Sequence, residues 1–222
     1  MKNTVTKSLQ DILSKDVISF VLKVGFGSIL LWIILLWASW DLYAGLIATY
    51  IQKIPFVGSW EWFQSSGAFL TALILGYMLI IITISIFTSL YSEPLLIKLA
   101  KKHYPNISIV GSPNITTSVI LSIKAGLIFL FLFLFTFPLI FIPILGQIWM
   151  LWLWSLLIKE PTAYDVAPLF IADKKKVKEK TKKSGIIAMI ASLFNYVPVL
   201  NIFAPVFAQI LFLHNILGED NA

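Results

Sequence analysis

The sequence predicts an all-α integral membrane protein with two long transmembrane helices and two proline-broken, partly inserted helical hairpins. The 222 residues are 59% hydrophobic and only 13% charged, whereas soluble domains carry about 25% charged residues. The apolar residues also form long runs without a formal charge, of 28 residues at Phe63–Leu90 and of 34 residues each at Ala125–Ile158 and Ser184–Leu217. Because a hydrocarbon core of ~30 Å needs roughly 20 helical residues, each run is long enough to enter a membrane.

The composition excludes several classes of protein. The apolar content argues against a soluble enzyme and a nucleic-acid-binding protein. The absence of cysteine excludes disulfides and thiolate metal sites. With only His103 and His214, we expect no metal cluster, and no motif indicates a cofactor. The spacings typical of serine hydrolases, P-loop proteins and zinc proteases are also missing, so we do not expect an enzyme.

The first half of the chain is predicted to contain a surface helix, two spans and a polar loop. Residues 1–16 place apolar side chains at helical spacing among polar ones, which is typical of an amphipathic helix at the membrane surface. Residues 17–40 and 63–90 are the predicted spans. Residues 91–124 are predicted to form a lysine-containing helical loop on the cytoplasmic side.

The second half is predicted to contain the two hairpins, 125–158 and 184–217, joined by a basic cytoplasmic loop, 159–183. A similar pattern breaks both hairpins: a β-branched residue, proline, two apolar residues, then glycine or asparagine. It occurs at Ile142–Gly146 and Val197–Asn201, and a third copy lies at Ile54–Gly58. Since proline interrupts a helix and glycine or asparagine accepts positive φ, each copy predicts a tight turn. The turn residues are Pro143, Gly146, Pro198, Asn201 and Pro205.

The limb lengths and the lysines predict that the hairpins return to the side they entered. Limbs of 12 and 14 residues, 147–158 and 184–197, reach only roughly 18 and 21 Å. All 17 basic residues are lysine, and residues 159–183 hold eight of them. Two spans followed by two returning hairpins place every lysine-rich segment, and the N-terminus, on the cytoplasmic side. A four-span arrangement would export the eight lysines, and six short spans would fit the limb lengths poorly.

The broken helices suggest where a solute could pass. Half-helices that end inside a membrane expose N–H groups and a positive dipole end, which suit an anion. Interrupted helices of this kind line the substrate sites of many transporters. The candidate anion path consists of polar residues near the turns and two N-terminal lysines: Lys15, Lys23, Gln147, Asn195, Asn201 and Gln209. The alternative is that the polar residues only satisfy turn backbone or join helices.

Two further features have candidate roles. The lysines of Lys174–Lys183 form a solvated face or a patch for anionic lipid. His214, beside Asn215 near a helix end, is interpreted as half of a hydrogen-bonding pair, with a proton relay as the alternative.

Several stretches together resemble a known family. They are Phe87–Ala100, Phe137–Gly146, Lys159–Pro161, Lys174–Lys183, Ser192–Phe194 and Val197–Pro205. In this order they resemble the CysZ-type sulfate permeases, which belong with the etoposide-induced protein 2.4 membrane family. The resemblance implies a bacterial inner-membrane protein with two spanning helices and two partly inserted hairpins. It also implies an oligomer that takes up sulfate for cysteine synthesis without an ATP-binding domain.

One departure from the family bears on the substrate. Where the family carries a Gly-Leu-Arg anion motif at the start of the first span, this chain reads Asp16-Val17-Ile18. The arginine is absent and a nearby carboxylate would repel sulfate. Lys15 or Lys23 could substitute as a point charge, without the two-pronged geometry of arginine.

The leading hypothesis is therefore an oligomeric inner-membrane permease or channel for a small inorganic anion, with sulfate first. The rival hypothesis is a membrane scaffold or interaction protein with a lysine-rich cytoplasmic face and no transport activity.

Overall fold

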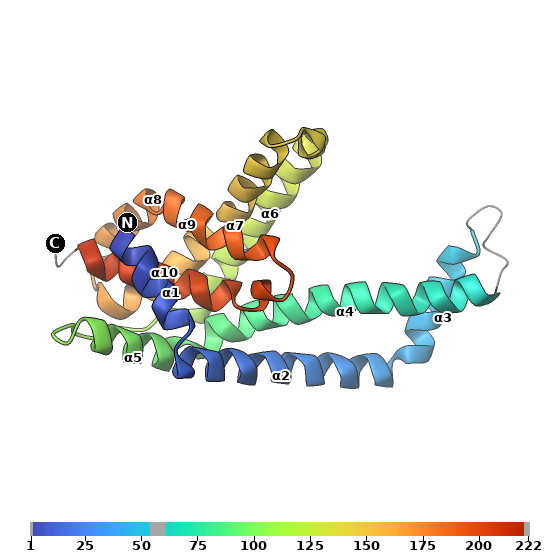
Figure 1. The fold of residues 1–222 in the computed structure, drawn as a ribbon, viewed down its shortest axis with the longest axis horizontal. Coiled ribbons are helices and arrows are strands. Elements are labelled where there is room, and N and C mark those ends of the chain that lie inside the picture. The colour runs from blue at the N-terminus through green and yellow to red at the C-terminus, as the bar shows by residue number, and fades with distance from the viewer. Residues whose placement is uncertain (1, 54–60, 220–222) are drawn as a thin grey trace. The chain divides into compact units, whose positions relative to one another are not determined.

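The computed structural model describes residues 2–53 and 61–219 (Figure 1). Within these ranges the chain forms helices joined by turns and no strand, so the predicted all-α class is confirmed. The proline pattern at Ile54–Gly58 lies outside the described residues. The chain divides into two compact units, a smaller one of residues 22–86 and a larger one of residues 1–21 and 87–222.

The described residues of the smaller unit form three helices. They are most of α2 (Lys15–Ala38), α3 (Trp40–Ile51) and most of α4 (Glu61–Tyr91). Side-chain hydrogen bonds join distant parts of this unit: the Trp32 indole N–H donates to the Thr83 hydroxyl at 2.8 Å, and the Tyr43 hydroxyl donates to the Ala68 carbonyl at 3.0 Å. Polar side chains inside an apolar unit therefore fix how its helices pair.

The larger unit holds the remaining helices and the two hairpins. Its α-helices are α1 (Lys2–Ile12), α5 (Glu93–His103), α6 (Ile115–Thr136), α7 (Leu145–Phe170), α8 (Lys174–Lys183), α9 (Gly185–Ser192) and α10 (Ala204–Glu219). The described part of this unit also contains three short 3₁₀ helices: η1 (Phe137–Phe141), η2 (Leu193–Tyr196) and η3 (Leu200–Ile202). The first hairpin is α6–η1 with α7, and the second is α9–η2 with η3–α10.

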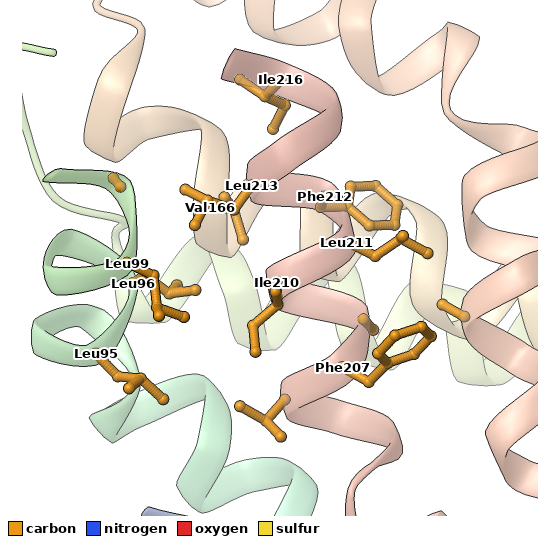
Figure 2. Packing of buried hydrophobic residues seen from close by; sticks show 14 of the residues in the cluster. Leu95, Leu96, Leu99, Val166, Phe207, Ile210, Leu211, Phe212, Leu213 and Ile216 are labelled. Atoms are coloured by element: carbon orange, nitrogen blue, oxygen red, sulfur yellow. The ribbon is translucent and has the colours of Figure 1, made fainter. Parts of the chain in front are cut away.

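Helix α10 lies at the centre of the hydrophobic core of this unit. It contacts α1, α5, α7 and α9, and its Phe207, Ile210 and Phe212 are fully buried. Leu96 and Leu99 of α5 belong to the same buried cluster, which Figure 2 shows from close by. A helix that is apolar on every side needs an apolar environment on every side, and here the neighbouring helices provide much of it.

Among the described residues, two helical segments are long and apolar enough to cross a membrane: α2 and the stretch Ile115–Phe141 formed by α6 and η1. Residues 76–91 with α5 make a third if this bent pair forms one span. The stretch Ile115–Phe141 was predicted as a hairpin limb of residues 125–142 and is longer than predicted, whereas residues 63–90 as the second span stay a prediction. The limb is longer because α6 begins ten residues before the uncharged run, where the Asn114 side chain accepts a hydrogen bond from the Thr117 N–H at 3.2 Å.

The predicted second span forms α4, whose end meets α5 at a 62° bend. The returning limb of the first hairpin, α7, is also longer than predicted, because it continues past Ile158 to Phe170 with Pro161 and Pro168 inside it. Limb length therefore does not limit the first hairpin to a partial insertion.

The predicted N-terminal surface helix forms as α1, and it packs on α10. Its Ser8, Asp11 and Ile12 are buried, whereas Leu9 and the following Leu13, just past the end of the helix, are exposed. The inward face of α1 therefore contacts protein, and it carries a buried carboxylate.

Candidate functional site

The two hairpin turns share one backbone conformation. The residue after the turn proline has positive φ in both: Ile144 with φ 66° and ψ −57°, and Val199 with φ 72° and ψ −45°. A backbone bond closes each turn at the same position, from Gly146 N–H to the Ile142 carbonyl at 2.8 Å and from Asn201 N–H to the Val197 carbonyl at 3.1 Å. A 3₁₀ helix precedes each turn as well. The two copies of the sequence pattern are therefore one structural motif used twice.

The structure corrects the predicted role of the glycine and the asparagine in this motif. Positive φ was expected at Gly146 and Asn201, but among the described residues it occurs only at Ile144 and Val199. Glycine is needed at position 146 for a different reason: a Cβ there would collide with the carbonyl oxygens of Leu139 and Ile140. The turn thus places its strain on β-branched residues, in a γ-turn region that such residues rarely adopt.

The tips of the two hairpins meet. The Tyr196 hydroxyl, at the end of η2, donates to the main-chain carbonyl of Gln147, at the start of α7, at 2.6 Å. The Trp154 ring contacts the Tyr196 ring edge-on, with centroids 4.8 Å apart. The hydrogen bond attaches Gln147 to Tyr196, the residue that follows Asn195, and Asn195 and Asn201 flank the second turn. Gln147 is exposed, and the two asparagines are half-buried.

The two lysines of the predicted anion path are both exposed. Lys15 is the first residue of α2 in the larger unit, and Lys23 belongs to the smaller unit. Neither is grouped with the hairpin tips by any described contact. Next to Lys15, the Asp16 carboxylate is paired with Lys98 of α5 at 2.8 Å. The negative charge that departs from the family motif is thus matched by a positive one.

Gln209 of the predicted path lies elsewhere, in a buried polar cluster around Asp165. The Asp165 carboxylate accepts hydrogen bonds from the hydroxyls of Ser89 at 2.6 Å and Ser118 at 2.8 Å, and it is hydrogen-bonded to Gln209. Burial raises the pKa of Asp165, although these hydrogen bonds act in the opposite direction. The cluster joins α4, α6, α7 and α10. A carboxylate beside Gln209 does not favour an anion there.

A second buried carboxylate, Asp11 of α1, was missed by the sequence analysis. It contacts His103 and His214 at 2.9 and 2.8 Å, and Lys102 at 3.0 Å. Burial alone would raise the pKa of Asp11, but the hydrogen bonds from these nitrogens lower it well below its usual range. His214 therefore does not depend on Asn215 as a partner. The sequence did contain a signal for this carboxylate. Asp11 is next to Ile12 and about one helical turn after Ser8, so it lies on the face of α1 that packs inward.

Comparison with known protein families finds one that matches most of the chain. Residues 4–205 match the family described as sulfate transporter CysZ/etoposide-induced protein 2.4. No match was found among curated proteins or among solved structures. The family match includes both hairpin turns and ends at Pro205, so nearly all of α10 lies beyond it.

Proposed function

The chain belongs to the sulfate transporter CysZ/etoposide-induced protein 2.4 family, and from that premise we propose that it is a permease or channel for a small inorganic anion. Sulfate is the first candidate, and no covalent chemistry is involved. The proposed setting is the bacterial inner membrane, with the N-terminus and the lysine-rich segments on the cytoplasmic side. Such an anion would pass along the two joined hairpin tips.

The observation that carries this proposal is the repeated turn. Two hairpins use the same strained backbone conformation and meet through the bond between Tyr196 and Gln147. Strained residues in otherwise regular helices persist where the surrounding structure holds them, and such residues are concentrated at functional sites. At these tips Gln147, Asn195 and Asn201 offer amide donors, which bind an anion without a full positive charge.

The charge around the start of α2 is compatible with an anion. Asp16 replaces part of the family's anion motif, but its salt bridge with Lys98 offsets its charge. Lys15 and Lys23 remain exposed and available as point charges. Because neither forms the two-pronged contact of arginine, we expect weaker discrimination among tetrahedral anions.

A membrane scaffold is the second candidate, and one surface favours it. Helix α8 exposes six lysines on a short polar helix: Lys174, Lys175, Lys176, Lys178, Lys182 and Lys183. Lys180 differs, because its ammonium group donates to the Ile216 carbonyl of α10 at 2.6 Å and so attaches α8 to the core. A fixed array of lysines suits anionic lipid or an acidic partner. Assembly into a homo-oligomer is compatible with either candidate.

The test is uptake of radioactive sulfate into proteoliposomes that contain the purified protein, with empty liposomes and excess sulfite as controls. Saturable uptake that sulfite reduces supports the permease. Gln147→Leu and Asn201→Leu each remove an amide at a tip, and we expect at least a roughly tenfold loss of uptake, about the value of one hydrogen bond to a charged group. Gln10→Leu, at an exposed position on α1, is the matched control and should leave uptake unchanged.

Two results would favour the scaffold instead. One is the absence of sulfate uptake by protein that is folded and reconstituted. The other is normal uptake by both leucine variants, because the path would then not depend on the tip amides.

A further inference from the structure

The chain has two histidines, and the structure brings both to one carboxylate. His103 Nε2 lies 2.9 Å from the Asp11 carboxylate, and His214 Nε2 lies 2.8 Å from Oδ2 of the same group. These contacts join α1 to the end of α5 and to α10, across 92 and 203 residues of sequence. Three helices thus each contribute one side chain to a single point in the larger unit.

The three side chains are held in place before any ligand arrives. The Asp11 side chain is fully buried, the His214 side chain is 1% exposed and the His103 side chain is 17% exposed. The rings of His103 and His214 also contact each other edge-on, with centroids 4.9 Å apart, so each restricts the orientation of the other.

The orientation of His214 is fixed from the other side of its ring. The Tyr104 hydroxyl lies 3.2 Å from His214 Nδ1, which directs Nε2 toward Asp11. A hydroxyl can donate or accept, so Tyr104 can hold the ring in either tautomer. Support of this kind behind a histidine is typical of metal ligands.

We propose that Asp11, His103 and His214 form a binding site for one divalent metal ion of the zinc class. Two imidazoles and a carboxylate are a common ligand set for such ions. The three ligand atoms lie within 4.8 Å of one another. Ligands of a tetrahedral zinc ion, with bonds of about 2.0–2.1 Å, lie roughly 3.3 Å apart. Metal binding would therefore lengthen both nitrogen–oxygen contacts, now 2.9 and 2.8 Å, and bring the two imidazole nitrogens to a similar spacing, with His103, the most exposed of the three, as the side chain freest to move.

Lys102 competes with the metal for the same carboxylate. Its ammonium group lies 3.0 Å from Asp11 Oδ1, and its side chain is 58% exposed. Without a metal, this ammonium group balances the buried charge. When a metal binds, the lysine can swing into solvent and leave a coordination position for water. Removing the lysine charge should therefore strengthen metal binding, an effect opposite in sign to the loss of a ligand.

This site is independent of the proposed anion path, because none of its residues lies at the hairpin tips. A metal here would fasten α1 to α5 and α10. Its existence can be tested without any transport measurement, so failure of one proposal does not imply failure of the other.

The experiment uses the full-length protein in detergent, produced without a polyhistidine tag and stripped of metal with EDTA. Co²⁺ is added as a spectroscopic probe, because its visible absorption reports nitrogen and oxygen ligands, and Zn²⁺ is then used to displace it. We expect one ion per chain. We expect H103Q to weaken binding at least about 100-fold, since a ligand is lost.

Lys102→Met should tighten Co²⁺ binding roughly tenfold, because a competing charge about 3 Å from the carboxylate is removed. Lys98→Met is its matched control: Lys98 lies one turn earlier on α5 and pairs with the exposed Asp16, so this variant should bind as the wild type does. Asp16→Asn is the corresponding control for Asp11→Asn. Size-exclusion chromatography identifies variants that fail to fold, and H103Q, altered at the most exposed ligand, is the decisive one.

Three results would overturn the proposal. The first is wild-type protein that binds neither Co²⁺ nor Zn²⁺ at one ion per chain. The second is a folded H103Q variant with unchanged affinity, and the third is a Lys102→Met variant that binds no more tightly than Lys98→Met. In each case the cluster would only join the three helices by hydrogen bonds and would not bind a metal ion.

Discussion

The two hairpin turns follow the same backbone path, but they differ at the fifth residue of the shared pattern. In the first hairpin this residue is Gly146, which has no room for a Cβ next to the carbonyls of Leu139 and Ile140. In the second it is Asn201, which carries a side chain at the same place. The positive φ of Ile144 and Val199 is therefore the feature that the two turns share, and the fifth residue differs with the surroundings of each turn.

The largest expected effect is a loss of stability from a substitution in the first turn that has no equivalent in the second. Gly146→Ala places a methyl group against two backbone carbonyls, so we expect a loss of about 2 kcal/mol in the free energy of unfolding. Asn201→Ala keeps a Cβ that is already accommodated and should cost less than about 1 kcal/mol. Thermal unfolding in detergent measures both variants. Equal losses would mean that the two turns do not differ as described.

A smaller effect is expected from removing the hydrogen bond that joins the two hairpin tips. Tyr196→Phe removes the hydrogen bond to the Gln147 carbonyl but keeps the ring contact with Trp154, so we expect a loss of about 1 kcal/mol in the free energy of unfolding. Tyr91→Phe, at an exposed tyrosine of α4, is the control and should change unfolding little. Sulfate uptake should fall in Tyr196→Phe if the joined tips form the path. Unchanged uptake together with reduced stability would limit Tyr196 to a packing role.

The smallest effect has the opposite sign. Ile144→Gly and Val199→Gly relieve the positive φ, and both side chains are largely exposed, at 76% and 66%, so little burial is lost. Because the flexibility of glycine offsets part of the gain, we expect each variant to be more stable by about 0.5 kcal/mol. Thermal unfolding in the same detergent checks this. A loss of stability in both would show that the isoleucine and valine side chains hold the turns.

Much of the fold was predictable because its signals are local. The uncharged runs indicated helices in a membrane, and Pro143 and Pro198 marked where two of them turn. The exact turn residue was not predictable, because preference for positive φ favours Gly146 and Asn201, and the surrounding backbone overrides it. The limb lengths were also misjudged, since Asn114 starts α6 before the uncharged run begins.

Which helices form the core could not be predicted from the sequence. Helices α6 and α10 are similarly apolar, yet α6 buries few residues, such as Ser118 and Ala125, while α10 is buried along its length. Hydropathy reports the preference for leaving water, but lipid and protein satisfy that preference equally well. The two buried carboxylates were missed for a related reason, because Asp11 meets His214 only through contacts across 203 residues.

The central position of α10 also has a consequence for how the protein is made. A ribosome delivers α1 early and α10 last among the described helices, yet α1, α5, α7 and α9 all pack on α10. Until α10 has been synthesised, the inward faces of those helices have no permanent partner, and Asp11 lacks one of its two histidines. The larger unit should therefore assemble after translation of its helices rather than one helix at a time. A nascent chain stalled before Ala204 should remain sensitive to proteases at α1 and α5, and the released full-length chain should not.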